Sequence, residues 1–217
     1  IHAVSAAPYG SVSMLPVTYG YLLMLGAEGL KYVTEMAILN ANYLASSFEK
    51  LGFKILFKGK QGRVGHEMIW DCSAFNKEYG ISELDIAKRL MDFGFHAPTL
   101  SFPVHGTLMV EPTESEPKEE LDRFIEALKT IREEKCEEAE GKADKTDNVL
   151  KNAPHTHKVL RADEWTHTYP RSKAAYPLPW VAENKFWPQV GRVDDGYGDR
   201  NLMCTCDPLY DYVNDEN

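Results

Sequence analysis

The stretch Asp92–Ser115, DFGFHAPTLSFPVHGTLMVEPTES, carries the clearest structural signal in the chain. A helix is expected to end near Gly94, because glycine readily adopts the left-handed conformation that closes a helix. Apolar strand segments follow, and the polar residues His96, Thr99 and His105 lie at their ends. The acidic turn that closes the stretch predicts the start of another helix. We interpret this pattern as the rim of a binding site.

Apolar periodicity predicts the elements that come before this stretch. Ser11 can cap a first helix, Pro16 should kink it one turn later, and Gly26 should break it. A longer helix is expected over roughly 27–50, with Gly52 at its C-terminal cap. Short strands are expected at 53–57, 64–71 and 107–110.

Two further helices are marked by their starting residues. Ser82 and Asp85 have the spacing of a capping box, which predicts a helix that ends near Gly94. Ser115 and Pro117 mark the start of the next helix. Its apolar residues recur at helical spacing: Leu121, Phe124, Ile125, Leu128 and Ile131.

This alternation of helices and short strands predicts a small α/β domain of α+β type over 27–140, with helices on both sides of the strands. Residues 1–26 are expected to form a connecting loop and helix. Residues 141–217 are rich in Pro, Asp, Asn and aromatic residues and show little periodicity, so we expect an irregular C-terminal extension that is ordered against another surface.

Composition narrows the possible functions. The chain has 217 residues, 43% of them hydrophobic, and can bury a sizeable core. Its net charge of −9 and pI near 5.3 argue against nucleic-acid binding. No apolar run is long enough to cross a bilayer. The four cysteines are too scattered for a disulfide scaffold, which favours a reducing compartment. Because the first residues look like mid-domain sequence, we expect the chain to be part of a longer protein.

Several short motifs have a structural explanation that is better than a catalytic one. The GHE triplet at 65–67 lacks the second histidine of a zinc protease motif, so pairing of His66 or Glu67 with the backbone is favoured. The CTC and HTH motifs at 204–206 and 155–157 have no partner at metal-binding spacing, and structural or incidental roles are favoured for them. No GxGxxG, P-loop or GxSxG pattern is present.

Two places are better candidates for a ligand. The APYGS segment at 7–11 offers backbone amides and a hydroxyl at a helix start, which suits a phosphate, although most such starts bind nothing. In GFHAPT, Pro98 should hold Ala97 extended and so direct His96 and Thr99 at a strand edge. A core or interface role for His96 stays open, and His105 can equally be a turn residue.

Several strings of this chain, taken in order, resemble the C-terminal part of the glycine decarboxylase family, the pyridoxal-phosphate subunit of the glycine cleavage system. They are SAAPYGSVSMLP, TEMAILNANYLA, GRVGHEMIWD, GFHAPTLSFPVHGTLMVEPTESE, ELDRFIEAL, YPLPW, ENKFWPQVGRVDD and GDRNLMCTC. The similarity covers nearly the whole chain and falters mainly over 136–165.

The resemblance implies the C-terminal lobe of a fold-type I pyridoxal-phosphate enzyme. In that family the cofactor is bound to a lysine, glycine loses carbon dioxide, and the aminomethyl group passes to a lipoyl arm on a carrier protein. The lysine lies in an LHKTF-like motif upstream of the SAAP segment, and no such motif occurs here. No catalytic residue is therefore assigned, and the chain alone is expected to be inactive.

The resemblance also suggests roles for individual residues. Gly10 and Ser11 would help to hold the cofactor phosphate, across a dimer interface in the full-length enzyme. His96 and Thr99 would line the entrance for glycine or the lipoyl arm, and Cys204 with Cys206 would be a redox-sensitive pair. The expected partners are glycine, the lipoylated carrier protein and a second copy of the enzyme. The expected location is the mitochondrial matrix, or the cytoplasm of a bacterium.

Two alternatives stay open. The first is another fold-type I pyridoxal-phosphate enzyme, such as a different amino-acid decarboxylase or an aminotransferase, because fold alone does not decide the reaction. The second is a non-catalytic regulatory or interaction module that keeps only this domain. The missing lysine is consistent with that second alternative.

Overall fold

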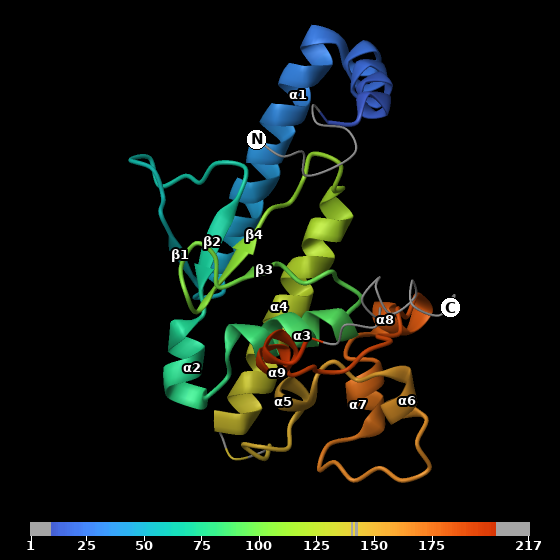
Figure 1. The fold of residues 1–217 in the computed structure, drawn as a ribbon. Helices are drawn as coiled ribbons and strands as arrows, with labels where there is room; N and C mark the ends of the chain where they lie inside the picture. Colours follow the sequence, from blue (N-terminus) through green and yellow to red (C-terminus); the bar gives the residue numbers. More distant parts are fainter. Residues whose placement is uncertain (1–9, 140, 142, 203–217) are drawn as a thin grey trace, which may run out of the picture.

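The structure is a computed structural model that describes residues 10–139, 141 and 143–202. A four-stranded antiparallel sheet with the order β1-β2-β4-β3 lies at its centre (Figure 1). The strands are β1 (Lys54–Leu56), β2 (Met68–Asp71), β3 (Thr99–Leu100) and β4 (Thr107–Val110). The last of these has the predicted bounds. The second strand is shorter than predicted, because residues 57–67 form a long connection instead.

The pairing register sends alternate side chains to opposite faces of the sheet. Trp70 lies opposite Ile55 and Leu108, and all three are buried in the main core. The other face carries residues that are not part of this core, namely Leu56, Ile69, Thr99 and Met109. The core therefore lies on one side of the sheet only.

Three helices cover the core face. They are α1 (Leu15–Lys50), α3 (Glu83–Asp92) and α4 (Lys118–Ala139), and each contributes residues to the same hydrophobic core. The expectation of helices on both sides of the strands is therefore wrong. Because the strands are antiparallel, no crossover helix has to cover the second face. The domain is of the α+β kind.

The break in α1 occurs at Gly26, as predicted. Gly26 has φ 61° and ψ −172°, so two helical segments meet there at an angle. The kink expected at Pro16 is wrong, because α1 begins at Leu15 and Pro16 lies in its first turn, where no backbone N–H is needed. Ser11 precedes a short 3₁₀ turn, Val12–Met14, and its side chain makes no capping hydrogen bond.

The capping box of α3 is confirmed. The amide of Asp85 donates to the Ser82 hydroxyl, and the amide of Ser82 donates to the Asp85 carboxylate. Gly94 follows the helix with φ 88°, as expected for its C-terminal end. The start of α4 directly after Pro117 is also confirmed. One short helix, α2 (Ser73–Tyr79), was not predicted.

Aromatic rings fill the centre of the core. Trp70 packs against Phe53 with 4.6 Å between ring centroids, and against Phe48 and Phe75 at 5.7 and 6.0 Å. Phe48 comes from α1 and Phe75 from α2, so the rings join these helices to the sheet. Removing one such buried ring typically destabilises a domain by about 3–5 kcal/mol.

The segment expected to be an irregular extension contains short helices. They are α5 (Val149–Asn152), α6 (His157–Leu160), α7 (Arg171–Ala175), α8 (Pro179–Glu183) and α9 (Asp195–Arg200). Val149, Leu150 and Val181 belong to the main core, so this segment is packed against the domain.

Asp85 and Arg89 of α3 hold this segment in place through buried charges. Asp85 accepts hydrogen bonds from Lys151 at 2.8 Å and Arg192 at 2.7 Å. Arg89 is fully buried and pairs with Glu134 of α4 at 2.5 Å. Its other hydrogen bonds go to Asp92 and to the carbonyls of Lys173 and Ala174. Burying an arginine is tolerated only when its donors are satisfied in this way.

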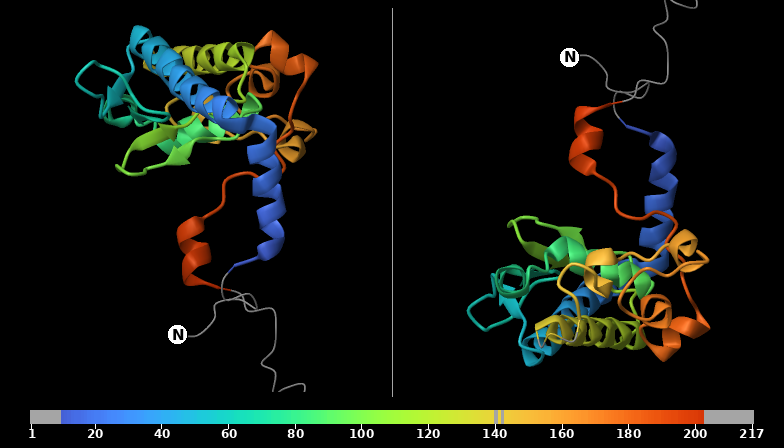
Figure 2. Two further views of the ribbon diagram at one scale, coloured as in Figure 1. Left: turned by 90° about the horizontal axis from the view of Figure 1, so that it is seen from above. Right: turned by 90° about the horizontal axis from the view of Figure 1, so that it is seen from below.

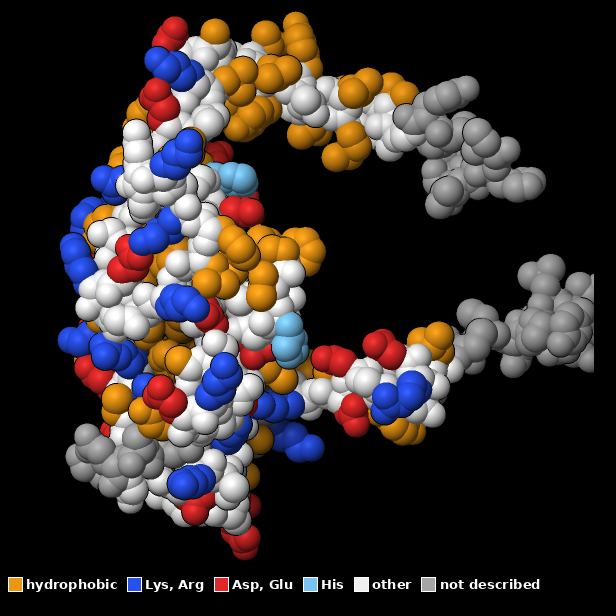
Figure 3. Space-filling view, turned by 90° about the vertical axis from the view of Figure 1, so that its left-hand side faces the viewer, with side chains coloured by type: hydrophobic (Ala, Val, Ile, Leu, Met, Phe, Trp, Pro, Cys, Tyr) orange, Lys and Arg blue, Asp and Glu red, His pale blue; other side chains and the backbone are white. Residues whose placement is uncertain are grey.

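Two arms project from the body in the same direction. One is the first half of α1, and the other is the last described part of the chain with α9 (Figure 2). Figure 3 shows a hollow between them, with hydrophobic side chains along the α1 arm. Exposed apolar residues of this half of α1 include Val17 and Leu23, which are 66% and 65% exposed. Nothing in the described part of the chain covers this apolar surface.

We expect Arg89→Leu to lower the free energy of unfolding by about 3–5 kcal/mol, because it leaves the buried Asp92 and Glu134 without their cation. Lys129→Leu, which removes the exposed partner of Glu133, should change it by less than about 1 kcal/mol. Urea titration followed by tryptophan fluorescence measures both. Equal effects of the two substitutions would contradict the importance of the Arg89 contacts.

Candidate functional site

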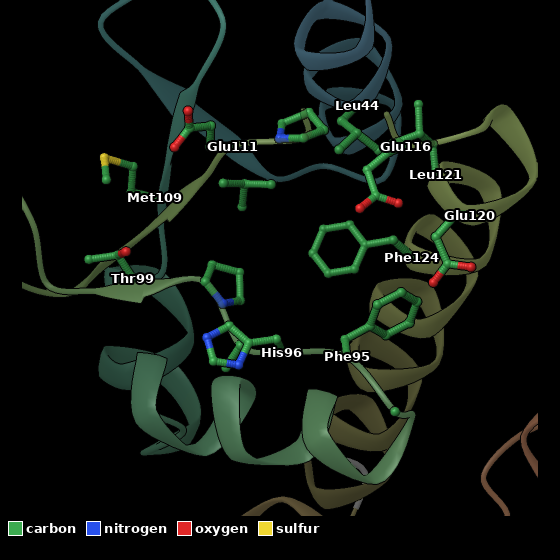
Figure 4. A pocket seen from close by; sticks show the side chains of 15 residues that line it. Leu44, Phe95, His96, Thr99, Met109, Glu111, Glu116, Glu120, Leu121 and Phe124 are labelled. Atoms are coloured by element: carbon green, nitrogen blue, oxygen red, sulfur yellow. The ribbon is translucent and has the colours of Figure 1, made fainter. Parts of the chain in front are cut away.

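A cleft of about 440 Å³ lies between the β3–β4 edge of the sheet and α4 (Figure 4). The quoted stretch of sequence forms most of its lining, with Gly94–Thr99 on one side and Met109–Pro112 on another. Leu44 of α1 and Phe124 of α4 add apolar surface. Residues from two helices, α1 and α4, and two strands, β3 and β4, thus meet at one opening.

His96 and Thr99 both line this cleft. Both side chains are exposed, and Thr99 begins β3. Ala97 and Pro98 lie between them in the connection, neither helix nor strand, that joins the end of α3 to the sheet. The path of the backbone, rather than a network of hydrogen bonds, therefore sets where the side chains of His96 and Thr99 lie. Their chemical role stays a prediction.

Carboxylates add a polar rim to the apolar floor. Figure 4 shows the side chains of Glu116 and Glu120 reaching into the cleft, with Phe124 between them and His96. Glu111 lies on the β4 side. A surface of this kind can accept hydrogen bonds from an amine or amide while it shields an apolar stem.

His105 lies outside the cleft. It is an exposed residue of the turn that joins β3 to β4, next to Gly106 with φ 78°. The turn is held by Ser101, whose hydroxyl accepts from the Gly106 amide at 3.2 Å and donates to Glu83 at 2.7 Å. His105 could have been a site residue or a turn residue, and its position in the structure agrees with a turn residue.

Gly10 and Ser11 are not near the cleft residues in the fold. They lie at the free end of the α1 arm, are exposed, and Gly10 has φ 89°. The Ser11 hydroxyl is 2.9 Å from that of Ser13. These residues alone form no enclosed phosphate site, and no lysine lines the cleft. The described residues therefore do not make a complete site for pyridoxal phosphate.

His66 contacts carboxylates rather than the backbone. Its Nε2 atom is 3.9 Å from Glu111 and 4.0 Å from Glu67, and the three side chains are exposed. The structure shows no hydrogen bond from the described backbone to His66 or Glu67. The expectation of backbone pairing was wrong, because both side chains point to the surface beside β4.

His155 is the polar residue whose surroundings the sequence did not indicate. It is 1% exposed, and its Nδ1 lies 2.7 Å from Asp92 while its Nε2 lies 2.8 Å from the Tyr169 hydroxyl. Its amide donates to the other oxygen of Asp92 at 2.7 Å. A structural role was favoured for the HTH motif, and for His155 that interpretation is confirmed.

Burial and charge act in opposite directions on these groups. Burial alone would raise the pKa of Asp92, but the hydrogen bonds from His155 and the charge of Arg89 hold that pKa below its usual value. Burial lowers the pKa of Lys185 to about 8. The Lys185 amine donates to the Asp92 carbonyl at 2.5 Å, so it caps the end of α3.

The cysteines in the described part of the chain do not form a pair. Cys72 is buried, and burial raises the pKa of its thiol, whereas Cys136 is exposed. Cys204 and Cys206 lie outside the described residues, and their redox role stays a prediction. Within the described ranges, no group of three or more His, Cys, Asp or Glu side chains is placed to hold a metal ion. No helix there has the length and apolarity to cross a membrane.

Comparisons with known proteins give a consistent result. The family described as glycine dehydrogenase, C-terminal domain, matches residues 33–155. A glycine dehydrogenase (decarboxylating) from Flavobacterium johnsoniae is 61% identical over 213 residues, or 98% of this chain and 22% of that relative. The protein of the same name from Bdellovibrio bacteriovorus is 56% identical over 212 residues, which are again 98% of this chain and 22% of that relative. The chain thus spans about a fifth of the length of these curated relatives.

We expect the stability of this fold to fall in acid through Asp92. Because its pKa is lower in the folded state, its contribution is present above the unfolded value of about 3.9 and is lost as pH falls below it. Asp92→Asn should therefore unfold more easily at pH 7 and depend less on pH between about 5 and 3. Asp163→Asn, at an exposed position, is the control. Parallel pH profiles for Asp92→Asn and the unmodified chain would contradict this assignment.

Proposed function

This chain belongs to the glycine dehydrogenase family, and from that membership we propose that the full-length protein decarboxylates glycine and passes the aminomethyl group to a lipoyl carrier protein. The electron pair of the broken bond to carbon dioxide stays with the glycine α-carbon and then forms its bond to one sulfur of the carrier's disulfide. The sulfur–sulfur bond breaks in that step, and the second sulfur is reduced to a thiol. Pyridoxal phosphate, held by a lysine outside this chain, supplies the electron sink for that bond cleavage. The match over 33–155 is the observation that carries this proposal.

In this proposal the described domain is the lobe that closes over the reaction site. The cleft contributes its wall, with His96 and Thr99 at the entrance for glycine or the lipoyl arm. An apolar floor with carboxylates at its rim suits a slender aliphatic chain that ends in polar groups. The cleft therefore orients and shields a substrate, while the chemical centre lies elsewhere.

The α1 arm would pack against the remainder of the enzyme. Its exposed residues are large and apolar, and Met24 is 87% exposed. Contiguous apolar surface of this kind marks an interface. The relatives are several times longer than this chain, so they contain the sequence that could cover it. Gly10 and Ser11, at the end of the same arm, would then reach the cofactor phosphate, in the same subunit or across a homodimer interface.

A non-catalytic module that keeps only this lobe is the second candidate function. Such a module would share the match over 33–155 and would act without a cofactor lysine. The location that fits bacterial relatives is the cytoplasm, and the mitochondrial matrix would apply to a eukaryotic source.

The full-length protein should exchange labelled bicarbonate into the carboxyl group of glycine when the carrier protein is present. The 217-residue chain alone should show no exchange, because it lacks the lysine that binds the cofactor. Scintillation counting of purified glycine measures both. Exchange by the isolated chain would contradict the proposal that the cofactor-binding lysine lies outside this chain. The absence of exchange by the full-length protein would favour the non-catalytic module.

Thr99→Val in the full-length enzyme should lower the exchange rate about tenfold or more while the melting temperature changes little, because the exposed hydroxyl is removed without loss of volume. Thr130→Val is the matched control, since that hydroxyl bonds only within α4, to the Glu126 carbonyl. An unchanged rate in Thr99→Val would remove Thr99 from the site.

A further inference from the structure

The connection between β1 and β2 carries a concentration of positive charge. Residues 57–65, FKGKQGRVG, contain Lys58, Lys60 and Arg63 and no acidic residue, although the whole chain has a net charge of −9. Figure 1 shows this connection extending from the edge of the sheet, away from α6. We call residues 57–63 the basic loop. Such a local reversal of sign attracts an oppositely charged partner.

Backbone and side-chain contacts fix the shape of the basic loop. The Gly59 amide donates to the Arg63 carbonyl at 2.8 Å, and the Gly62 amide donates to Gly59 at 2.9 Å. Asn42 of α1 then holds Val64 on both sides, accepting from its amide at 3.1 Å and donating to its carbonyl at 2.9 Å. The loop is thus pre-organised, which lowers the entropy lost on binding.

Phe57 occupies a conformation that a phenylalanine rarely adopts. Its φ is 56°, in the left-handed region that favours glycine, and its side chain is 70% exposed. Folding gains nothing from an exposed ring at such a position, and glycine would suit the backbone better. Strained residues of this kind cluster at functional sites. The ring therefore has the character of a contact residue.

The cations of the loop differ in their partners. Lys58 forms an ion pair with Glu49 of α1. For Lys60 and Arg63, which are exposed, the structure shows no ion pair with any described carboxylate. Two free cations next to an exposed aromatic ring make a small surface that combines charge with an apolar anchor. Aromatic and arginine side chains are the residues that most often dominate binding energy at protein interfaces.

We propose that the basic loop is the docking surface for an acidic face of the lipoyl carrier protein. Phe57 would enter an apolar depression on the carrier, and Lys60 and Arg63 would pair with its carboxylates. This inference rests on the proposed function, which supplies the carrier as the partner. A nucleic acid is the less suitable occupant, because a chain of net charge −9 repels phosphates outside this one loop.

The test is the dissociation constant of the full-length enzyme for the lipoylated carrier, measured by calorimetry. Lys60→Glu with Arg63→Glu should raise it about tenfold or more. Lys158→Glu with Arg161→Glu makes the same charge change at two exposed positions, one in α6 and one directly after it, and should leave the dissociation constant within about twofold. Phe57→Gly should weaken binding while the melting temperature stays equal or rises, a combination that a merely structural role does not give.

The proposal would be overturned if the loop variants bound the carrier with the same dissociation constant as the unmodified enzyme. It would also be overturned if Phe57→Gly lowered the melting temperature enough to explain its weaker binding by loss of folded protein. Tighter binding of a single-stranded oligonucleotide than of the carrier would also overturn it. Carbon dioxide release with free lipoamide as acceptor should be unaffected by the loop variants. If the enzyme binds the carrier but releases no carbon dioxide from glycine with either acceptor, the proposed function fails while the docking assignment stands.

Discussion

The constraint on which this structure depends is an apolar helix arm that the described chain leaves uncovered. The first half of α1 carries exposed Leu23 and Met24 beyond the break at Gly26. Water disfavours such a surface, so a stable protein has to bury it against something else. The second arm, which contains α9, projects in the same direction as the α1 arm (Figure 2), and the surface between the two arms is hollow (Figure 3). The lobe is therefore shaped to meet a larger body.

Behind this face, buried charges make the lobe a single unit. Arg89 hydrogen-bonds to residues of α3, α4 and α7. Asp85 accepts hydrogen bonds from Lys151 and Arg192, which lie in two separate parts of the C-terminal segment. A buried charge needs its partners, so these segments cannot separate without a large loss of stability. The cleft gains a firm wall as a result, since Gly94–Thr99 leaves the end of the same helix, α3. A rigid wall suits a lobe that orients substrate.

Local signals in the sequence predicted much of this. The capping box of Ser82, the start of α4 and the break at Gly26 depend on neighbouring residues, and each is confirmed. His96 and Thr99 were placed together because they are three residues apart. Contacts between residues far apart in the sequence could not be predicted. Asp92 and His155 are 63 positions apart, and no periodic pattern in the sequence indicates that they are in contact. The expectation that helices cover both faces of the sheet was wrong for the same reason, because the order of the strands depends on residues that are distant in the sequence.

The most direct measurement is the structure of the full-length protein with pyridoxal phosphate and glycine bound. We expect Leu23 and Met24 to be buried against the domain that holds the cofactor. We also expect the cleft with His96 and Thr99 to open toward the bound glycine. A structure in which the arm stays exposed and the cleft opens to solvent, away from the cofactor, would contradict both expectations.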